Sequence, residues 1–528
     1  MNKRTILPMA MLALLASCSS EMDEIQQADN KFEGQVTIKV SPFEFGEDTR
    51  TTLTLDTDPT TGKEQLTFGW KDTEEIGVFP VNPKSNSQAH HQLNSYDKQG
   101  TITYFDGGGW SLTRGYTYAA YYPFNPNMKV VDTYEDIMLS MNGQIQNGNG
   151  TLQHIGDGYD YMYSCGTVPE SGDMVFHFNH VTSIVQINLT MPVAANWTKV
   201  TLVNKDNSKV FITEAKMNAT NGAITPTATA SSVALDLTNV ETTADNMKLT
   251  LYLAVLPTTT GEVVLTASTD GTYDYYVSLP SKTFRTGKAY RWTATVSNAL
   301  YARDGKSGNE DYVDLGLSAK WATKNIDAIT LTDFGGYYAW GETEEKENYD
   351  YRTYKFSPDG AWNSLSKYTF ADNQENSSWY DNGTFIGDNI KQLSTDDDVA
   401  YVKTNGLYRM PTGAELNELY TNCSYKFVTN YCGTNINGFV FFKKGASIPS
   451  SDEFSVPHIF LPAAGYKTID EYGNYIITAV NIGSEYWSST LSNRYSDSGT
   501  YFWGNKDDSD VSSTRRSDGQ PIRPVLNE

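Results

Sequence analysis

Phe176-His-Phe-Asn-His180, separated by three residues from Ile184-Val-Gln-Ile-Asn-Leu189, decides the fold of the first 300 residues of this chain. Apolar and polar residues alternate in both runs, which is the pattern of a β-strand with one buried face. Similar runs occupy 35–40, 248–253 and 263–267, and turn residues such as Asn221-Gly222 and Asp270-Gly271 separate them. Helical periodicity is almost missing between 31 and 298, so we predict two β-sandwiches with a break near His180.

The composition limits the partners of the chain. Its 528 residues include 63 Asp or Glu and 40 Lys or Arg, which gives a net charge of −23. A surface of this charge repels nucleic acid and anionic headgroups, so neither is a predicted partner. The length and a hydrophobic content of 39% are enough for about three packed domains.

The first residues have the features of a secretory signal. Lys3 and Arg4 precede a short apolar run over 6–16, and small residues follow it, which predicts a signal peptide of residues 1–17. The sequence Leu15-Ala-Ser-Cys18 resembles the lipobox of bacterial lipoproteins, which implies lipidation of Cys18. Residues 18–34 resemble an acidic surface tether. We therefore expect a surface-exposed lipoprotein of the cell outer membrane, held by acyl groups, with a plain secreted protein as the alternative.

A series of short motifs runs through residues 35–298. They are Thr49-Arg-Thr-Thr52, Phe68-Gly-Trp70, Tyr118 to Phe124, Leu256-Pro257 and Phe284 to Trp292. In this order they resemble the fimbrillin (major-fimbrium-like) family. The resemblance implies a mainly β fold with two transthyretin-like β-sandwich domains, over 35–180 and 181–298.

The same resemblance implies a mode of assembly. Such subunits are exported as lipoproteins and cut after an arginine beyond the first strand, and a strand of another pilus subunit fills the open groove. Arg50 is the best-placed arginine, because 36–45 has the pattern of the removable strand. The alternative is that Arg50 is a solvent-facing strand residue.

Beyond a polar linker over 299–310, the composition shifts towards Trp, Gly and Tyr. The motifs are Gly336 to Thr343, Tyr408-Arg-Met-Pro-Thr412, Ile459 to Gly465, Glu485-Tyr-Trp-Ser-Ser-Thr490 and Ile522-Arg-Pro-Val525. They resemble the "major paralogous domain" family, which is related in fold to C-type lectins and to the formylglycine-generating enzyme. The resemblance implies an α+β, C-type-lectin-like domain over 311–528.

The residues of this last third allow further predictions without the family. Thr412-x-x-Glu415 predicts a capping box at the start of a short helix. Arg523 is expected to close the fold by pairing the two ends of the domain. Three tryptophans are expected in the core: Trp321, Trp340 and Trp487.

Aromatic residues in polar loops are the candidate ligand-binding residues. Trp379 and Tyr380 lie within 376–383, where burial is not expected, and Trp503 and Trp362 are further candidates. No cofactor and no metal are predicted, with calcium at the Asn and Asp residues of 503–510 as the alternative. His177 and His180 are expected to be core or hydrogen-bonding residues rather than metal ligands.

Three cysteines remain after Cys18. Cys423 and Cys432 either form a disulfide or stay unpaired, and Cys165 is expected to be a buried thiol. Formylglycine-type enzymes depend on a closely spaced cysteine pair, which this spacing does not reproduce, so we do not expect an enzyme.

Together these features predict a surface lipoprotein adhesin at a pilus tip. Its partners would be other pilus subunits, through strand insertion, and a host or microbial surface glycan or protein, bound by the C-terminal domain. The second hypothesis is a non-pilus surface lipoprotein that binds polysaccharide for nutrient capture. An enzyme in the C-terminal domain is the third.

Overall fold

The computed structural model describes Phe32, Lys84 and residues 36–40, 43–45, 55–57, 64–66, 75–82, 89–96, 102–106, 112–128, 132–308, 310–446 and 454–528. Of 43–45, 55–57, 64–66, 89–96 and 102–106 the backbone alone is described. The expected signal peptide, Cys18 and Arg50 lie outside the described residues. No helix in the described part of the chain has the length and apolar character needed to cross a membrane.

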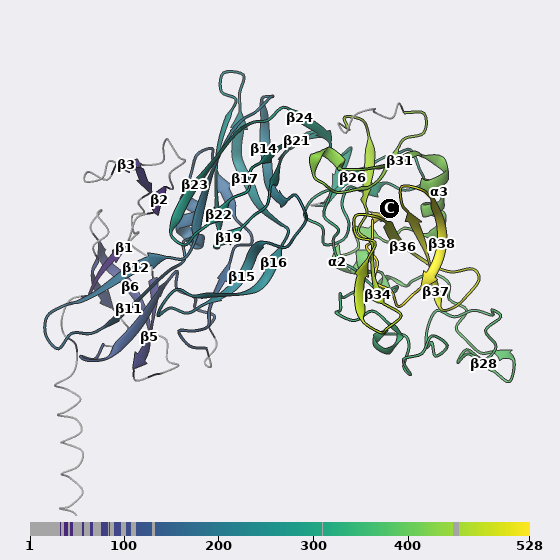
Figure 1. Ribbon diagram of the computed structural model, residues 1–528, viewed down its shortest axis with the longest axis horizontal. Helices are drawn as coiled ribbons and strands as arrows, with labels where there is room; N and C mark the ends of the chain where they lie inside the picture. Colours follow the sequence, from purple (N-terminus) through teal and green to yellow (C-terminus); the bar gives the residue numbers. More distant parts are fainter. Residues whose placement is uncertain are drawn as a thin grey trace, which may run out of the picture.

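The fold is mainly β, as predicted, and its strands form three groups along the long axis of the molecule (Figure 1). The first group is a closed barrel in the order β1-β12-β11-β8-β5-β6-β7. Its strands are β1 (Val36–Val40), β5 (Glu75–Asn82), β6 (Ala89–Tyr96), β7 (Ile102–Asp106), β8 (Thr117–Tyr122), β11 (Met162–Thr167) and β12 (Met174–His180). Apolar side chains at alternate positions fill the barrel, among them Ile38, Ile76, Val78, Phe176 and Phe178.

The second group is built from two six-stranded sheets. One has the order β10-β17-β14-β20-β21-β24 and the other β18-β13-β23-β2-β4-β3. The strands of the first are β10 (Ile145–Asn147), β14 (Ala195–Asn204), β17 (Ser232–Thr242), β20 (Val263–Thr269), β21 (Tyr273–Leu279) and β24 (Asn298–Tyr301). Those of the second are β2 (Phe43–Phe45), β3 (Leu55–Thr57), β4 (Glu64–Leu66), β13 (Ser183–Thr190), β18 (Lys248–Val255) and β23 (Lys288–Thr295). Trp197, Trp292 and many Val and Leu residues form the core of this group.

Smaller elements complete these two groups. A three-stranded sheet contains β9 (Ile137–Ser140), β15 (Phe211–Met217) and β16 (Ile224–Ala230), and β19 (Thr258–Thr259) pairs with β22 (Thr283–Phe284). A short π-helix covers Ile155–Tyr159.

Strand pairing crosses the predicted break near His180. β9 and β10 precede His180 in the sequence, but they pair with β15 and β17, which follow it. The buried side chains of Gln144 and Gln146 reinforce this exchange, because their Oε1 atoms accept the N–H groups of Ala254 and Tyr252, each at 2.8 Å. The segment 137–147 is therefore part of the second group by hydrogen bonding.

The predicted first strand, 36–45, is two strands in two different sheets. β1 pairs with β12 in the barrel, whereas β2 pairs with β23 and β4 in the second group. The expected linker over 299–310 is also ordered into strands, because β24 joins β21, and β25 (Gly305–Ser307) joins β26 (Glu310–Val313).

The described part of the third group combines short strands with the α-helices α2 (Val399–Lys403) and α3 (Gly413–Asn422). A sheet of order β25-β26-β27-β39-β30 holds β27 (Trp321–Ala322), β30 (Tyr408–Arg409) and β39 (Val525–Leu526). Further sheets join β31 (Ser424–Val428), β32 (Gly438–Phe442) and β33 (His458–Pro462), and β36 (Ser484–Leu491), β37 (Ser498–Gly504) and β38 (Ser509–Arg515). Two hairpins are β28 (Tyr380–Asp381) with β29 (Thr384–Phe385), and β34 (Tyr466–Ile469) with β35 (Tyr475–Thr478). Single 3-10 turns cover Tyr351–Thr353, Thr395–Asp397 and Tyr431–Gly433.

The core of the third group confirms several predictions. Trp321, Trp340 and Trp487 are at most 1% exposed. The capping box is present, because Thr412 accepts from the N–H of Glu415 while the Glu415 carboxylate accepts the N–H of Thr412 at 2.7 Å. An apolar cluster that includes Val264, Leu300 and Phe460 packs the second group against the third.

Candidate functional site

The first strand of the barrel is the candidate assembly site. β1 lies parallel to β12 over five residue pairs, from Val36↔Met174 to Val40↔Phe178. On its other edge β1 meets β7 through the pair Ile38↔Ile102. One short strand therefore separates β12 from β7, and its backbone pairs with both.

The side chains of β1 alternate between the barrel interior and its outer face. Ile38 is fully buried and Val36 is 9% exposed, whereas Lys39 is exposed. Upstream of β1, the N–H of Phe32 donates to the carbonyl of Leu112 at 2.9 Å, and the Arg114 guanidinium lies over the Phe32 ring at 5.1 Å. Phe32, Val36 and Ile38 thus fill an apolar groove whose other wall belongs to the rest of the barrel.

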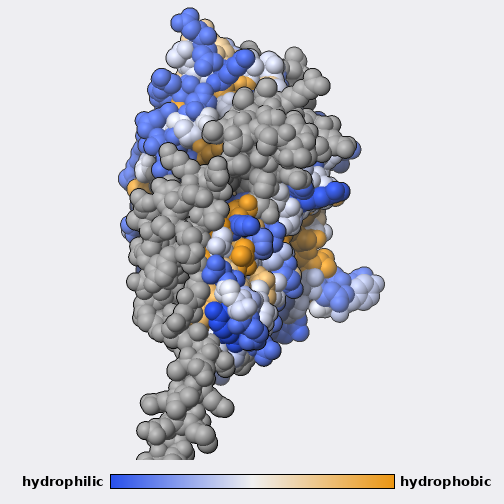
Figure 2. Space-filling view, turned by 90° about the vertical axis from the view of Figure 1, so that its left-hand side faces the viewer, coloured by the Kyte–Doolittle hydropathy of each residue, from blue (hydrophilic) through white to orange (hydrophobic). Residues whose placement is uncertain are grey.

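Hydrophilic residues dominate the described surface at this end of the molecule. Figure 2 shows the face, on which a few hydrophobic patches interrupt the hydrophilic surface. Val175 of β12 is 36% exposed, and it lies opposite Thr37 of β1. The apolar groove under β1 therefore contrasts with the mostly hydrophilic residues that the structure describes on this face.

The expectation that Trp379 is an exposed loop residue is wrong. Its side chain is 2% exposed, and its Nε1–H donates to Oδ1 of Asp372 at 3.1 Å. Tyr380 is half-buried, and its hydroxyl donates to the carbonyl of Asp372. The loop folds back over its own aromatic residues, so the Trp379 ring is not available for stacking on a sugar.

The other two aromatic candidates differ from each other. Trp503 is half-buried in β37, between Glu485 and Asp510 of the neighbouring strands. Trp362 is 47% exposed and lines a cleft of about 240 Å³. Charged side chains share this cleft with Trp362: Asp350, Arg352, Arg515 and Asp518.

The charges of this cleft are held in place by contacts within the third group. Arg352 Nε donates to Oδ2 of Asp350 at 2.7 Å, and the Tyr475 hydroxyl donates to the same oxygen at 3.2 Å. Burial raises the pKa of Asp518 to about 6, although Arg515 lies 3.7 Å away. An exposed indole can stack on an apolar face of a ligand, while the charged side chains beside it form hydrogen bonds with polar groups at the edge of the ligand.

The structure agrees with one of the two alternatives for Cys423 and Cys432 and corrects the prediction for Cys165. Cys423 and Cys432 form no disulfide; both are buried thiols, and they lie in different core clusters. Burial raises the pKa of Cys423 to about 12, which suppresses the reactive thiolate. Cys165 is exposed rather than buried, because its side chain points outward from β11.

The histidines of β12 face opposite sides of the strand. His180 is buried, and its Nδ1 lies 2.6 Å from Oδ1 of Asp160, so it is a hydrogen-bonding residue as predicted. His177 is exposed. At the calcium alternative, the amide oxygen of Asn505 accepts the N–H groups of Asp507 and Asp508. Within the described ranges, no three His, Cys, Asp or Glu residues are grouped to hold a metal.

The family comparison covers most of the first two groups of strands and begins after β1 and β2. Residues 49–310 match the model of the fimbrillin-like family. This match confirms the resemblance predicted from the motifs of 35–298. The likeness of residues 311–528 to the major paralogous domain family stays a prediction.

Solved structures from Bacteroides are similar to parts of the chain. A candidate cell adhesion protein from Bacteroides ovatus has 17% identity and a TM-score of 0.35, over 51% of this chain and 96% of its own. One from Bacteroides uniformis has 17% identity and a TM-score of 0.32, over 51% and 99%. A fimbrial protein from Bacteroides ovatus has 13% identity and a TM-score of 0.24, over 94% and 99%. No curated protein matches the chain.

Proposed function

We propose that this protein is a cell-surface fimbrial adhesin without catalytic activity, assembled by replacement of its first strands. The fimbrillin-like match over 49–310 supports the class. The position of β1 supports the mode of assembly, because a single strand fills the space between β12 and β7. In this proposal Cys18 carries the lipid that anchors the precursor to the outer membrane.

The physical drive for assembly comes from what β1 covers. A cut at Arg50 would release the segment that contains β1 and β2, and β12 would lose its parallel partner over five residue pairs. Unpaired strand edges and an open apolar groove are unfavourable in water. A strand from another subunit with apolar residues at alternate positions would restore both the hydrogen bonds and the burial that Val36 and Ile38 provide.

We propose a tip position because the third group is a folded unit whose strand β39 is already paired on both edges. β39 pairs with β27 through Val525↔Trp321 and with β30 through Arg409↔Val525. Both of its edges are occupied, so this segment is not available as a donor strand. The third group would instead present a contact surface, for which the cleft beside Trp362 replaces the buried Trp379 as the leading candidate.

The decisive experiment compares the full chain with its Arg50→Ala variant after trypsin-like digestion. We expect the parent protein to lose an N-terminal peptide ending at Arg50 and then to form oligomers, measured by mass spectrometry and light scattering. Arg50→Ala should keep the peptide and stay monomeric. Arg494→Ala, at an exposed arginine of the third group, is the matched control and should behave as the parent.

Two outcomes would overturn the proposal. One is assembly of Arg50→Ala at the parental rate, which would show that another route opens the groove. The other is a cut protein that retains its peptide and never oligomerises. Full-length protein found only in membranes, and missing from isolated pili, would instead favour the nutrient-capture hypothesis.

A further inference from the structure

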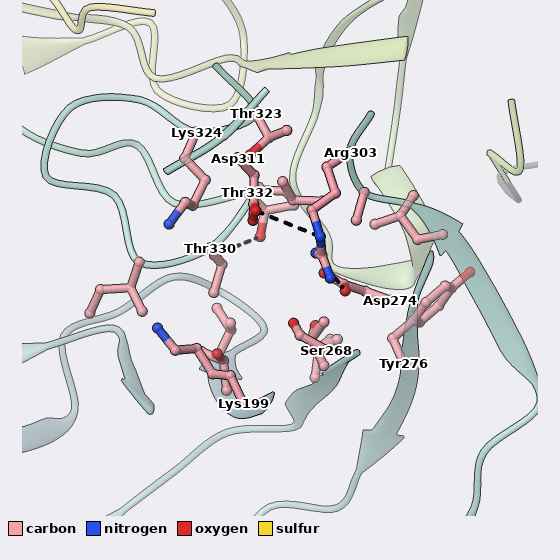
Figure 3. Close-up of a pocket in the computed structure, with 18 of the residues that line it drawn as sticks. Lys199, Ser268, Asp274, Tyr276, Arg303, Asp311, Thr323, Lys324, Thr330 and Thr332 are labelled. Carbon is pink, nitrogen blue, oxygen red and sulfur yellow. Dashed lines mark hydrogen bonds and ion pairs between the residues drawn. The ribbon is translucent and has the colours of Figure 1, made fainter. Parts of the chain in front are cut away.

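A cavity of about 570 Å³ lies between the second and third groups of strands. One wall comes from β14, β20 and β21, and the other from segment 323–332 and residues 431–434. Figure 3 shows side chains from both groups turned towards the same space. This volume is typical of small-molecule sites, which occur preferentially at domain interfaces.

Cationic side chains slightly outnumber acidic ones at this cavity, although the chain as a whole is strongly acidic. Arg303 and three lysines line it together with Asp236, Asp274 and Asp311. The lysines are Lys199, Lys306 and Lys324. Each of these lysines pairs with a carboxylate, but none of the three Nζ–oxygen distances is short. They are 3.3 Å from Lys199 to Asp236, 3.6 Å from Lys324 to Glu310 and 3.7 Å from Lys306 to Asp311. The amines of Lys199 and Lys324 face one another across one side of the cavity (Figure 3).

At the inner end of the cavity, Arg303 is held by several contacts. Arg303 is 5% exposed, and its guanidinium lies 3.2 Å from Asp274 and 3.6 Å from Asp311. It also donates to the carbonyl of Thr269. These contacts use the arginine structurally, which leaves the three lysines as the cations able to exchange their partners for a ligand.

Hydroxyl groups supply most of the remaining polar lining. They come from Thr198, Thr201, Thr266, Ser268, Thr323, Thr330, Thr332 and Thr434. Thr323 is 4% exposed, and its Oγ1 has no hydrogen-bond partner among the described residues. A buried hydroxyl without a partner is unfavourable, and a ligand hydroxyl in the cavity would satisfy it.

We propose that this cavity binds an acidic sugar, a saccharide with a carboxylate and several hydroxyl groups. The carboxylate would lie between Lys199 and Lys324, where charge-assisted hydrogen bonds are strongest. The threonine hydroxyls would bond the sugar hydroxyls, and Val264, Leu300 and Leu331 offer an apolar wall to its C–H face. The proposal rests on the adhesin role, adds a binding site separate from the cleft beside Trp362, and does not require strand exchange.

Titration calorimetry on the uncut, unassembled full chain tests the site. The probes are galacturonic acid, glucuronic acid and N-acetylneuraminic acid, with galactose as the neutral counterpart of the first. We expect at least one acid to bind about tenfold tighter than galactose, and higher salt to weaken it. The site would be refuted if none of the three acids binds tighter than galactose.

Substitutions of residues that line the cavity test whether the acidic sugar binds there. Lys199→Met combined with Lys324→Met should weaken the acid by about tenfold or more. Lys216→Met is the matched control, because Lys216 is similarly exposed (45% against 41% for Lys199) and also pairs with an aspartate, but lies outside the cavity. Thr323→Val should weaken binding several-fold with unchanged thermal stability. Parental affinity in the double variant would place the ligand elsewhere.

These measurements separate the two proposals. A uronate that binds the uncut protein supports the cavity whether or not Arg50 is the processing site. Normal oligomerisation after cleavage, with no binding of any acidic sugar, would leave the assembly mechanism standing and reject the ligand.

Discussion

Arg523 Nε donates a hydrogen bond to Oδ1 of Asn325 at 2.9 Å, although 198 positions separate the two residues. The other guanidinium nitrogens of Arg523 donate to the carbonyls of Ala322, Thr323 and Phe460. Burial lowers the pKa of Arg523 to about 10, so the side chain stays charged at neutral pH. One arginine thus joins the beginning, middle and end of the third group, as the sequence predicts.

Replacing this arginine should therefore unfold the third group or weaken it severely. Arg523→Met removes the donors of three buried carbonyls and of Asn325, for which we expect a loss of about 3–5 kcal/mol in the free energy of unfolding. Urea denaturation followed by tryptophan fluorescence measures it. Arg494→Met, at an exposed arginine, should change stability by less than about 0.5 kcal/mol. A comparable loss in both variants would contradict this role.

The capping box of α3 offers a smaller, local test. Thr412→Ala leaves the N–H of Glu415 without its side-chain acceptor, and N-cap replacements of this kind cost about 1 kcal/mol. Thr421 lies in the same helix and its hydroxyl bonds only the carbonyl four residues earlier, so Thr421→Ala is a matched control with little expected effect. Equal melting temperatures of Thr412→Ala and the parent would count against the cap.

His458 should make the third group sensitive to acid. Its Nδ1 lies 2.7 Å from the carbonyl of Val456 and its Nε2 2.7 Å from the Tyr431 hydroxyl, an arrangement that suits a neutral ring. Burial lowers its pKa to about 4, against an ordinary value of 6.5. As the pH falls, His458 therefore takes up a proton in the unfolded chain before it does so in the folded one. The stability contributed by the neutral, buried ring is complete above pH 6.5 and is lost as the pH falls towards 4.

Chemical denaturation at pH 7 and pH 4.5 measures this effect. His458→Gln should lose less stability between the two values than the parent does, even if it is less stable at both. The exposed His177, changed to Gln, should keep the parental pH dependence. An unchanged acid slope in His458→Gln would show that other groups govern it.

The three described cysteines should differ in reactivity. Iodoacetamide should modify the exposed Cys165 in the native protein, and the buried Cys423 and Cys432 only after denaturation. Peptide mass spectrometry identifies each site, and reductant should not alter the pattern. Recovery of a peptide that links Cys423 to Cys432 would contradict the structure.

Local patterns predicted much of the fold, because they depend on neighbours in the sequence. The alternation of 176–180 matches the buried and exposed faces of β12, whereas β13 is buried at every position from 183 to 187. The Thr412–Glu415 cap depends on one turn of chain. The pairing of β1 with β12 instead joins residues such as Val36 and Met174, and no local signal separates β1 from β2.

The candidate binding sites were less predictable from the sequence, because they depend on contacts between residues that are distant in the sequence. Trp379 lies in a polar segment typical of a surface loop, but the loop folds back and Asp372 accepts its indole N–H. The cavity unites Thr198, Lys324 and Thr434, which are distant in the sequence and become neighbours only when the two groups pack together. The lysines that line the cavity follow no regular spacing in the sequence, so no motif predicts that they come together.

The exchange of β9 and β10 has a mechanical consequence. These strands lie in the sequence between β8 and β11 of the barrel, yet their hydrogen bonds belong to β15 and β17. The chain leaves the barrel after β8, pairs with the second group through β9 and β10, and returns to the barrel at β11, so we expect heating to melt both groups in one cooperative transition. Tension applied to either end of the chain would likewise pass through these shared strands. We therefore expect the first and second groups to resist extension together rather than as two independently hinged domains.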